Sequence, residues 1–398
     1  MYLDALGAQR IPDPTTAGDF CRRFDETTIE ALQTAINQTR QRVWRAQPAA
    51  FFEDAIIDAD GTLAETTGQC KEGMDIAYNG VWGYHPLIVS LANTQEPLFL
   101  VNRSGNRPSS EGAADRFDQA AALCRAAGFQ RITFRGDTDF TQTGHLDRWD
   151  GEGVRFVFGC DARANLIGRA DILPARAWTP LERRPAYQVQ TEPRQRPANV
   201  KAAIIVAREF KNLRLEAEAV AEFSSQPAAC AKAYRMVVVR KHISVEQGDQ
   251  RLFDEIRYFF YLTNDHETAA ADIVFLANDR CNQENLIDQL KHGVSATRMP
   301  VDTLLRNWAY MVMAALAWTL KAWFALRLPE SGRWAARYAA EKAAVLRMEF
   351  KAFLHAFILI PVQVVRTSRR LVFRLLAWNP WQAVFLRGVD QLHQPLRS

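Results

Sequence analysis

The sequence predicts an α/β protein built around a mixed β-sheet. Three apolar stretches with the lengths of strands come first, at residues 54–60, 76–92 and 97–102. Helical and strand patterns then alternate, at residues 111–127, 130–137 and 154–160. Antiparallel strands followed by α/β crossovers give a mixed sheet, so this order of elements sets the fold class.

Residues 1–50 are predicted to form a helical N-terminal region. Thr15 and Thr16 can cap a first short helix. A longer amphipathic helix is expected from residue 25 to residue 44, because Ile29 and Ile36 recur on one face with other apolar residues. The arginines of this region can contact DNA, but packing of the helices on the core is at least as good an interpretation.

Residues 51–184 form the first part of the predicted core. The stretch 76–92 is broken near Gly83 and Pro86, and the polar residues 102–108 close the three strands. With another helix between the last two strands, the order becomes β-β-β-α-β-α-β. This is the order of the ribonuclease-H-like fold, a mixed five-stranded sheet flanked by helices.

The stretch from Ile56 to Leu63 delivers two carboxylates to the end of an apolar strand. Asp58 and Asp60 are two residues apart, so they share one face of an extended strand. Buried carboxylates are costly unless they are paired or bind a cation, which favours a metal-holding strand. Gly61 would let the backbone turn after them. The alternative is an ordinary Asp-Gly hairpin turn.

Asp137 ends the short strand predicted at residues 130–137. It would lie at the carboxyl edge of the sheet, where α/β proteins place their ligands. A Gly-Asp turn explains the same residues equally well. Asp139 is a weaker neighbouring candidate, since it lies further into the loop.

Residues 185–265 are predicted to be a linker followed by a β-rich insertion. Residues 185–197 are rich in Pro, Arg and Gln, and the following segment to residue 263 alternates like strands. The insertion is too long for a loop. Its basic side chains can grip a phosphate backbone or form the charged outer face of a structural subdomain; they are Lys201, Arg208, Lys211, Arg214, Arg240 and Lys241.

Residues 266–328 are predicted to complete the core. Asn278 or Asp279 can cap a helix on which Arg280, Glu284 and Lys291 share one face. An Arg–Glu pair at this spacing is often a surface salt bridge, but here it would lie beside a sheet that already supplies carboxylates. The uncharged run at residues 308–320 is 13 residues long, which is short of the ~20 needed to span a bilayer, so a buried core helix is expected instead.

Residues 329–398 are predicted to be a basic helical C-terminal region. Arg366, Arg369, Arg370 and Arg374 would share a helical strip with apolar residues as far as Trp378, and such a helix can lie on DNA, a membrane surface or a partner helix. The chain has 49 Lys and Arg against 45 Asp and Glu. From residue 296 onward the count is 15 against 5, so this part carries +10 and the remainder −6. This polarity suits a polyanionic partner, and a solvated basic helical tail is the alternative interpretation.

The six cysteines are scattered, with no Cys-x-x-Cys pair. The sequence therefore predicts no zinc site and no disulfide framework, which fits a reducing cytoplasm.

Several blocks of the sequence together resemble the DDE transposases of bacterial insertion sequences, in particular the 1380 group. The blocks are Asp58 to Thr62, Gly80 to Leu87, Arg135 to Asp137, Tyr258 to Asn264 and Asn282 to Ile287. The resemblance extends from about Leu6 to Phe324. It implies a ribonuclease-H-like fold and an Asp, Asp, Glu triad that binds two divalent metal ions.

The resemblance assigns the triad to Asp60, Asp137 and Glu284, with Asp58 as the alternative first ligand. It implies two Mg²⁺ ions, for which Mn²⁺ can substitute, and DNA contacts from Arg280, Lys291, Arg135 and Arg103. Arg280, Glu284 and Lys291 fit the spacing of the family's Tyr-Arg-Glu-Lys signature, but Ala277 stands at the tyrosine position. The N-terminus looks short for the family, so a region that binds transposon ends is expected to be incomplete or absent.

The implied activity is metal-dependent cleavage at the ends of an insertion sequence and strand transfer into target DNA. The implied partner is double-stranded DNA, bound by a homodimer on paired ends, without a membrane, in the bacterial cytoplasm at the nucleoid. Two alternatives stay open: a metal-dependent nuclease that does not join strands, and an inactive DNA-binding regulator of the element.

Overall fold

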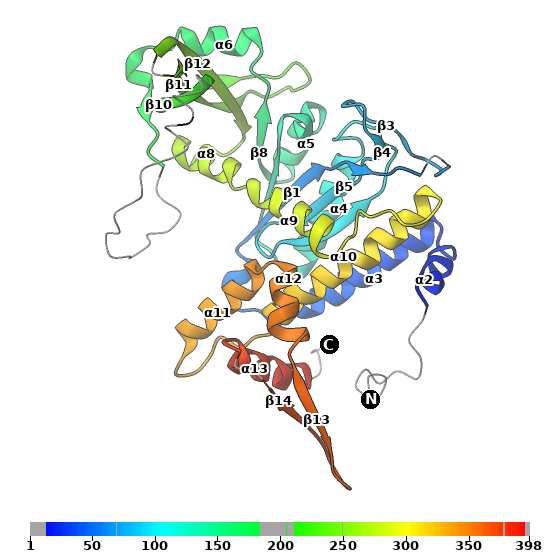
Figure 1. Cartoon of the computed structure of the whole chain (residues 1–398). Helices are drawn as coiled ribbons and strands as arrows, with labels where there is room; N and C mark the ends of the chain where they lie inside the picture. Colours follow the sequence, from blue (N-terminus) through cyan, green and yellow to red (C-terminus); the bar gives the residue numbers. More distant parts are fainter. Residues whose placement is uncertain are drawn as a thin grey trace. The chain divides into compact units, whose positions relative to one another are not determined.

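The computed structural model describes residues 13–68, 70–183, 204, 211–248, 250–376 and 379–394. It divides into two compact units, Met1–Phe134 with Arg280–Ser398 and Arg135–Asp279, called here the first and the second unit. The predicted linker at residues 185–197 lies outside the described residues, as do Lys201 and Arg208 of the predicted insertion. The α/β class is confirmed, because both units combine strands with helices (Figure 1).

The predicted antiparallel strands are present in the first unit. They are β1 (Asp54–Gly61), β5 (Leu87–Leu91) and β6 (Glu96–Val101), in the order β6-β5-β1. A smaller sheet in the order β2-β4-β3 consists of β2 (Ala64–Glu65), β4 (Trp82–Tyr84) and β3 (Asp75–Ile76). The break predicted near Gly83 and Pro86 falls at Pro86, where the chain passes from the smaller sheet to β5, whereas Gly83 lies inside β4.

The strand β7 (Arg131–Gly136) begins in the first unit and ends in the second. At its start, the Gln130 N–H donates to the carbonyl of Phe52 at 2.8 Å and the Arg131 N–H donates to that of Glu53 at 3.1 Å. The side chain of Arg131 also pairs with Asp54, the first residue of β1. The two strands therefore begin side by side.

The long apolar helix predicted after Pro300 forms the core of the first unit. The helices of this unit are α2 (Pro14–Cys21), α3 (Glu26–Trp44), α4 (Ala113–Ala127), α9 (Cys281–Asp288), α10 (Leu304–Leu326), α11 (Ala335–Arg347), α12 (Phe350–Phe353) and α13 (Gln382–Leu392). Helix α10 lies alongside α3 and β6 (Figure 1). Trp308, Met311 and Trp318 of α10 are buried there, so the prediction of a core helix is confirmed.

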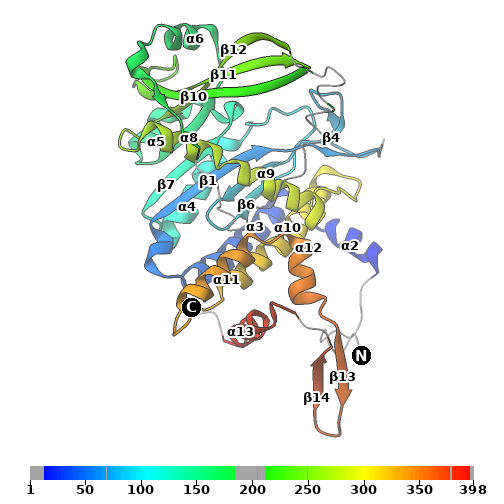
Figure 2. The same cartoon turned by 60° about the vertical axis from the view of Figure 1, so that its left-hand side comes forward.

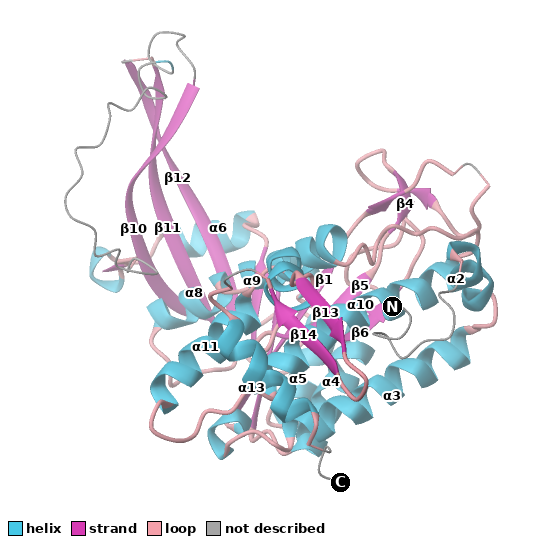
Figure 3. Ribbon diagram, turned by 60° about the horizontal axis from the view of Figure 1, so that its bottom comes forward, coloured by secondary structure: helices cyan, strands magenta, loops and turns pink. Residues whose placement is uncertain are grey.

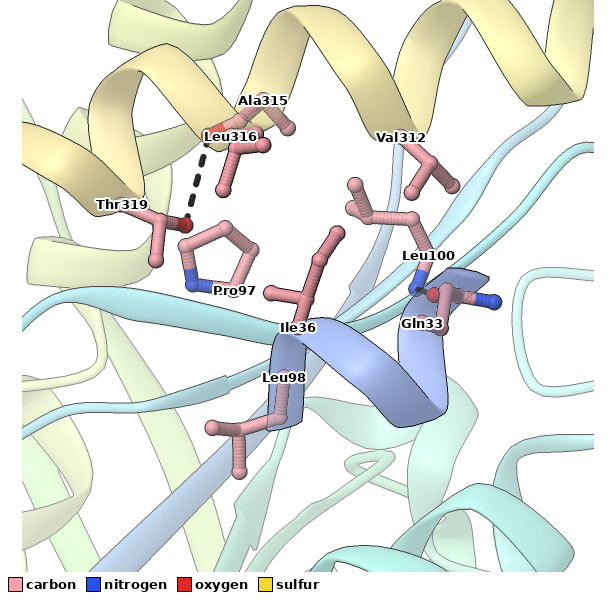
Figure 4. Close-up of a pocket in the computed structure, with 9 residues that line it drawn as sticks. All are labelled: Gln33, Ile36, Pro97, Leu98, Leu100, Val312, Ala315, Leu316 and Thr319. Atoms are coloured by element: carbon pink, nitrogen blue, oxygen red, sulfur yellow. Dashed lines mark hydrogen bonds between the residues drawn. The ribbon is translucent and has the colours of Figure 1, made fainter. Parts of the chain in front are cut away.

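Among the described residues, α10 alone has the length and apolar composition to cross a membrane. Its most apolar window is 61% buried within the protein, which is typical of the core helix of a globular protein. A cavity of about 20 Å³ remains between α10, α3 and β6 (Figure 4). Gln33 lines this cavity together with apolar side chains, and its Oε1 accepts a hydrogen bond from the Leu100 N–H at 2.8 Å.

The caps of three helices test the sequence predictions. Helix α3 begins after Asp25, as predicted, in a capping box with Thr28. The prediction for α2 was wrong, since Asp13 caps it by accepting from the Thr15 N–H, with Pro14 in the first turn. The predicted cap at Asn278 or Asp279 was also wrong. Helix α8 ends at Asn278, and α9 follows after Arg280, whose helical backbone leaves no side-chain cap.

The second unit contains the predicted β-rich segment. Its strands are β8 (Arg155–Cys160), β9 (Thr179–Pro180), β10 (Lys211–Ser225), β11 (Tyr234–Gln247) and β12 (Gln250–Thr263), in the order β8-β12-β11-β10-β9. Its helices are α5 (Leu146–Gly151), α6 (Ala164–Asp171) and α8 (Ala270–Asn278). Figure 3 shows β10, β11 and β12 as one long ribbon. Its lower part packs on α8 through Val237, Val239 and Ile273.

The prediction of a basic amphipathic helix at residues 366–378 was wrong. The chain forms an antiparallel hairpin there, with strands β13 (Val362–Arg366) and β14 (Leu371–Leu375), and Trp378 lies outside the described residues. Pro361 precedes the first strand, and the β-branched and aromatic residues Val364, Val365 and Phe373 favour an extended backbone. The hairpin projects from α12 and α13, which flank it in the chain (Figures 1 and 2).

A buried lysine in α10 gives a prediction for stability. Lys321 is almost inaccessible, donates to the carbonyl of Leu346 at 2.6 Å and lies over the ring of Trp318. Burial lowers the pKa of Lys321 to about 7, against roughly 10.4 in an unfolded chain. Between these two pKa values the unfolded state binds more protons than the folded state, so the folded state becomes more stable as the pH rises. The destabilisation of the folded state by the charged Lys321 is therefore fully present below pH 7 and fades as the pH rises to about 10.

Lys321→Met is therefore expected to raise the denaturation midpoint at pH 6.5, and the gain over wild type should shrink by pH 9.5. Urea denaturation at both values measures the difference. A gain that is equal at the two pH values would show that the charge of Lys321 is not its cause.

Candidate active site

The strand β1 carries Asp58 and Asp60 on the same side of its backbone. Ala55, Ile57 and Ala59 are fully buried and alternate with these acidic positions. Asp58 lies opposite Ser90 of β5 and is 1% exposed, whereas Asp60 lies opposite Ile88, and 15% of its side chain is exposed. Of the two carboxylates, Asp60 is thus the more accessible one, near the end of the strand.

Gly61 belongs to β1 and pairs with Leu87, so the Asp-Gly pair does not form a hairpin turn. The prediction that Gly61 turns the backbone was wrong. A Cβ atom at this position would lie 2.7 Å from Nε2 of His85, so a glycine is needed for this close approach. His85 is itself buried, with its Nδ1 2.8 Å from the carbonyl of Arg107. Sequence reasoning assigned no role to His85, which packs against the end of the acidic strand.

Arg280 lies between two of the predicted triad carboxylates, both in the first unit. Its Nη1 is 3.0 Å from Oδ2 of Asp60, and its Nη2 is 3.9 Å from Oε1 of Glu284. The guanidinium is 18% exposed, whereas the Glu284 side chain is 64% exposed. The structure therefore brings Asp60, Arg280 and Glu284 together. The predicted shared helical face of Arg280 and Glu284 is present.

Gln283 fastens α9 to the sheet. Its Nε2 donates to the carbonyl of Ile88 at 3.2 Å, and its Oε1 accepts from the hydroxyl of Ser90. Gln283 is 2% exposed, and Leu286 and Ile287 of the same helix enter the core. This docking fixes the position of the next residue, Glu284. Gln283 stood inside a family-like block of the sequence, but no local pattern identified it as a positioning residue.

Lys291 also lies within electrostatic reach of this group. It belongs to a π-helical turn (Gln289–Gly293) that follows α9. Burial lowers the pKa of Lys291, and the negative charges of Asp288 and Asp60 partly offset that effect. Arg280 therefore contacts the carboxylate of Asp60 directly, and Lys291 interacts with it electrostatically.

Asp137 belongs to the second unit and begins a short 3-10 helix (Thr138–Phe140). Its Oδ1 accepts from the Asp139 N–H at 3.0 Å, and its carboxylate is half-buried, whereas Asp139 is exposed. Gly136 allows the chain to turn closely from β7 into this helix, because a Cβ atom at position 136 would lie 2.5 Å from the Cβ atom of Phe140. Asp137 therefore directly follows β7, at the point where the sequence predicted the strand to end.

Arg103 and Arg135, both predicted to contact DNA, are buried. Arg103 donates to the carbonyl of His85 at 2.9 Å and to carbonyls of the loop that follows it; the loop acceptors are Pro108, Ser109 and Glu111, at 2.6–3.1 Å. Arg135 donates to the carbonyl of Leu276 in the second unit at 2.7 Å. Each guanidinium thus holds backbone within its own unit. Both side chains are buried, so their N–H groups are satisfied by backbone carbonyls.

The predicted ligands are each of the chemical type that a hard divalent cation takes. Asp58, Asp60, Asp137 and Glu284 offer carboxylate oxygens, the ligands that Mg²⁺ and Mn²⁺ prefer. In the part of the chain that the structure describes, no three acidic, His or Cys side chains form a metal-binding group. In the first unit, Arg280 supplies the positive charge between Asp60 and Glu284.

The sequence profile of the family described as "Transposase DDE domain group 1" matches residues 8–396. The chain belongs to this family. Among solved structures, this member of the DDE transposase family is similar to the piggyBac transposase in its synaptic complex with hairpin DNA, at 11% identity and a TM-score of 0.36. The similarity covers 77% of this chain and 55% of that one, so the chain spans about half the length of that protein. No curated protein matches the sequence significantly.

Proposed function

We propose that this protein is a transposase that cleaves DNA at the ends of a transposable element and joins the free strands to target DNA. The family match over residues 8–396 is the observation that carries this proposal. The grouping of Asp60 and Glu284 around Arg280 supports it, because both are carboxylates that the family pattern assigns to the reaction.

In this proposal Asp137 joins Asp60 and Glu284 at one edge of a ribonuclease-H-like sheet. Two observations support this. The strands β1 and β7 begin side by side in the first unit, and Asp137 comes directly after the last residue of β7. Strands that run in the same direction present their carboxyl ends at the same edge of a sheet, where α/β proteins place their ligands.

Asp60, Asp137 and Glu284 would hold two Mg²⁺ ions, or Mn²⁺ in their place, with Asp58 as the alternative first ligand. Members of DDE transposase families generally use divalent metal ions. When bound, such ions activate a water or a 3′-hydroxyl for attack on a phosphodiester and stabilise the leaving oxygen. Gln283 would orient Glu284, and His85 would support the end of β1.

Arg280 and Lys291 would neutralise the phosphates of the DNA near the scissile bond, because a guanidinium and an ammonium bind phosphate oxygens. Arg103 and Arg135 would act indirectly, by holding the backbone that carries the site. We further propose that the protein acts as a homodimer on paired ends and works in the bacterial cytoplasm at the nucleoid.

Strand joining is the reaction that tests the proposal. The purified chain is mixed with Mg²⁺, a donor duplex with a free 3′-hydroxyl at the element end, and a labelled target plasmid. A covalent donor–target product is expected, and it should be lost with EDTA. Cleavage without joining would identify a nuclease instead, and DNA binding without cleavage would identify a regulator.

The ion pair between Arg280 and Asp60 predicts that Arg280 competes with cations for the carboxylate. Arg280→Gln removes a positive charge 3.0 Å from Oδ2 of Asp60, so Mn²⁺ should bind several-fold more tightly in the absence of DNA. Titration followed by electron paramagnetic resonance measures free Mn²⁺ directly. The matched control is Arg306→Gln, which removes a guanidinium paired with Asp302 in the same unit. Equal affinity in wild type and Arg280→Gln would contradict the prediction.

A further inference from the structure

The β13–β14 hairpin is a two-stranded ribbon without a third strand. Five residue pairs form it, from Val362 with Leu375 to Arg366 with Leu371. The turn is closed by Thr367, whose N–H and hydroxyl both donate to the carbonyl of Arg370. At the base, the Leu376 N–H donates to the carbonyl of Pro361. These bonds hold the hairpin to itself.

One face of the ribbon carries five apolar side chains and is open to solvent. Paired residues of antiparallel strands point to the same side, so Val364 and Phe373 share a face with Val362, Leu375 and Leu371, and Arg366 lies at the turn end of that face opposite Leu371. Leu371 is 49% exposed and Phe373 52% exposed. An isolated two-stranded hairpin is only marginally stable in water. An exposed apolar face on such an element therefore indicates a partner that covers it.

The charge of the hairpin indicates which partner this is. Arg366, Arg369, Arg370 and Arg374 lie on or next to its strands, and the sequence contains no acidic residue between Glu349 and Asp390. In the described part of the chain, none of these four arginines forms an ion pair. Arg369 and Arg370 lie in the turn, at the end of the ribbon farthest from α12 and α13 (Figure 1). A polyanion satisfies all four guanidinium groups at once.

We propose that the β13–β14 hairpin is a DNA-binding ribbon that enters a groove of the duplex with its turn. A two-stranded ribbon has a backbone spacing of ~5 Å and fits the major groove, which is ~12 Å wide. The arginines of the turn and of the strand edges bind phosphates, and the apolar face covers sugars and base methyl groups. This inference rests on the proposed function for the identity of the polyanion as DNA.

The salt dependence of DNA binding tests the inference. Anisotropy with a fluorescent random-sequence duplex of about 30 base pairs gives the affinity of the full chain over a salt series without metal, and each phosphate contact contributes ~0.9 to the slope of log K against log salt. The double variant Arg369→Gln/Arg370→Gln should lower the magnitude of this slope by about 2 and the affinity at 0.1 M salt by about tenfold or more. The matched control is Arg333→Gln/Arg347→Gln, which removes two exposed charges from the same unit and should leave both values near those of wild type.

A second variant addresses the apolar face. Phe373→Ser should weaken binding several-fold without changing the salt slope, because it removes no charge. Thermal midpoints equal to wild type would show that these exposed substitutions leave the fold intact.

The outcomes separate the two proposals. A wild-type chain that neither binds nor cuts DNA would contradict the proposed function. A wild type that binds and cuts, together with an unchanged slope and affinity in Arg369→Gln/Arg370→Gln, would overturn the hairpin inference alone. Two other results would also overturn it. One is that Arg369→Gln/Arg370→Gln changes the mass of the DNA-free assembly in solution while its DNA affinity is unchanged, which would make the hairpin a contact between copies of the chain. The other is that Arg369→Gln/Arg370→Gln loses binding to anionic phosphatidylserine vesicles while its DNA affinity is unchanged, which would make the hairpin a membrane contact.

Discussion

Asp60→Asn is expected to reduce strand cleavage by at least about 10³-fold, which corresponds to roughly 4 kcal/mol of lost transition-state stabilisation. Asparagine keeps the shape of the side chain but loses the negative charge that a hard cation requires. Cleavage of a labelled end duplex in Mg²⁺ measures the loss. DNA affinity should stay within about threefold of wild type, because Asp60 is proposed to contact metal rather than phosphate.

Asp58→Asn is the matched control for this experiment. Asp58 lies on the same side of β1 but is buried opposite Ser90, whereas Asp60 lies near the end of the strand beside Arg280. We expect Asp58→Asn to retain more activity than Asp60→Asn. The reverse result would make Asp58 the first ligand, and full cleavage by Asp60→Asn would remove Asp60 from the triad. Equal thermal midpoints are needed to exclude unfolding as the cause.

The sequence predicted the acidic strand well because its signal is local. The apolar run that begins at Ala55 indicates the strand, and the alternation of apolar and acidic residues from Ile57 to Asp60 puts the carboxylates on one side of it. The spacing of Arg280 and Glu284 likewise sets their helical face. Long-range partners carry no such signal. Gln283 positions α9 through Ile88 and Ser90, which lie almost two hundred residues earlier in the chain, and no pattern around Gln283 announces this.

The C-terminal hairpin shows how a local pattern can mislead. Arginines and apolar residues from Arg366 to Leu375 fit a helical strip, but they also alternate as in a strand, and short runs of this kind are ambiguous. Val362, Val364 and Val365 before the turn favour the extended form. Gly61 was misjudged for a different reason: the close approach of His85, which decides its role, is a tertiary contact.

Buried polar groups are also hard to predict, and Glu96 is the clearest example. It is fully buried in the first unit and accepts four hydrogen bonds. Oε1 accepts from Arg40 at 3.0 Å and from Trp323 at 2.8 Å, and Oε2 accepts from Trp44 at 2.9 Å and from Thr94 at 2.6 Å. These bonds tie α3 and α10 to the start of β6. Burial lowers the pKa of Arg40, and the charge of Glu96 opposes this.

Glu96→Gln is therefore expected to lower the free energy of unfolding by about 3–5 kcal/mol, because it leaves the buried Arg40 without a counter-charge. The amide nitrogen of the glutamine would also replace one of the two carboxylate oxygens, where it cannot accept the hydrogen bonds that this oxygen accepts in the wild type. Urea denaturation followed by tryptophan fluorescence suits the measurement, since Trp44 and Trp323 both donate to Glu96.

Two further variants decide whether the charge pair is the cause. Glu111→Gln removes the partner of Arg107 from an exposed pair and should cost less than about 1 kcal/mol. Arg40→Met should be costly alone, but the double variant Arg40→Met/Glu96→Gln should cost clearly less than the sum of the two single variants, because neither charge is then left uncompensated. Strictly additive costs would mean that packing around α3 and α10, and not the ion pair, makes Glu96 indispensable to the first unit.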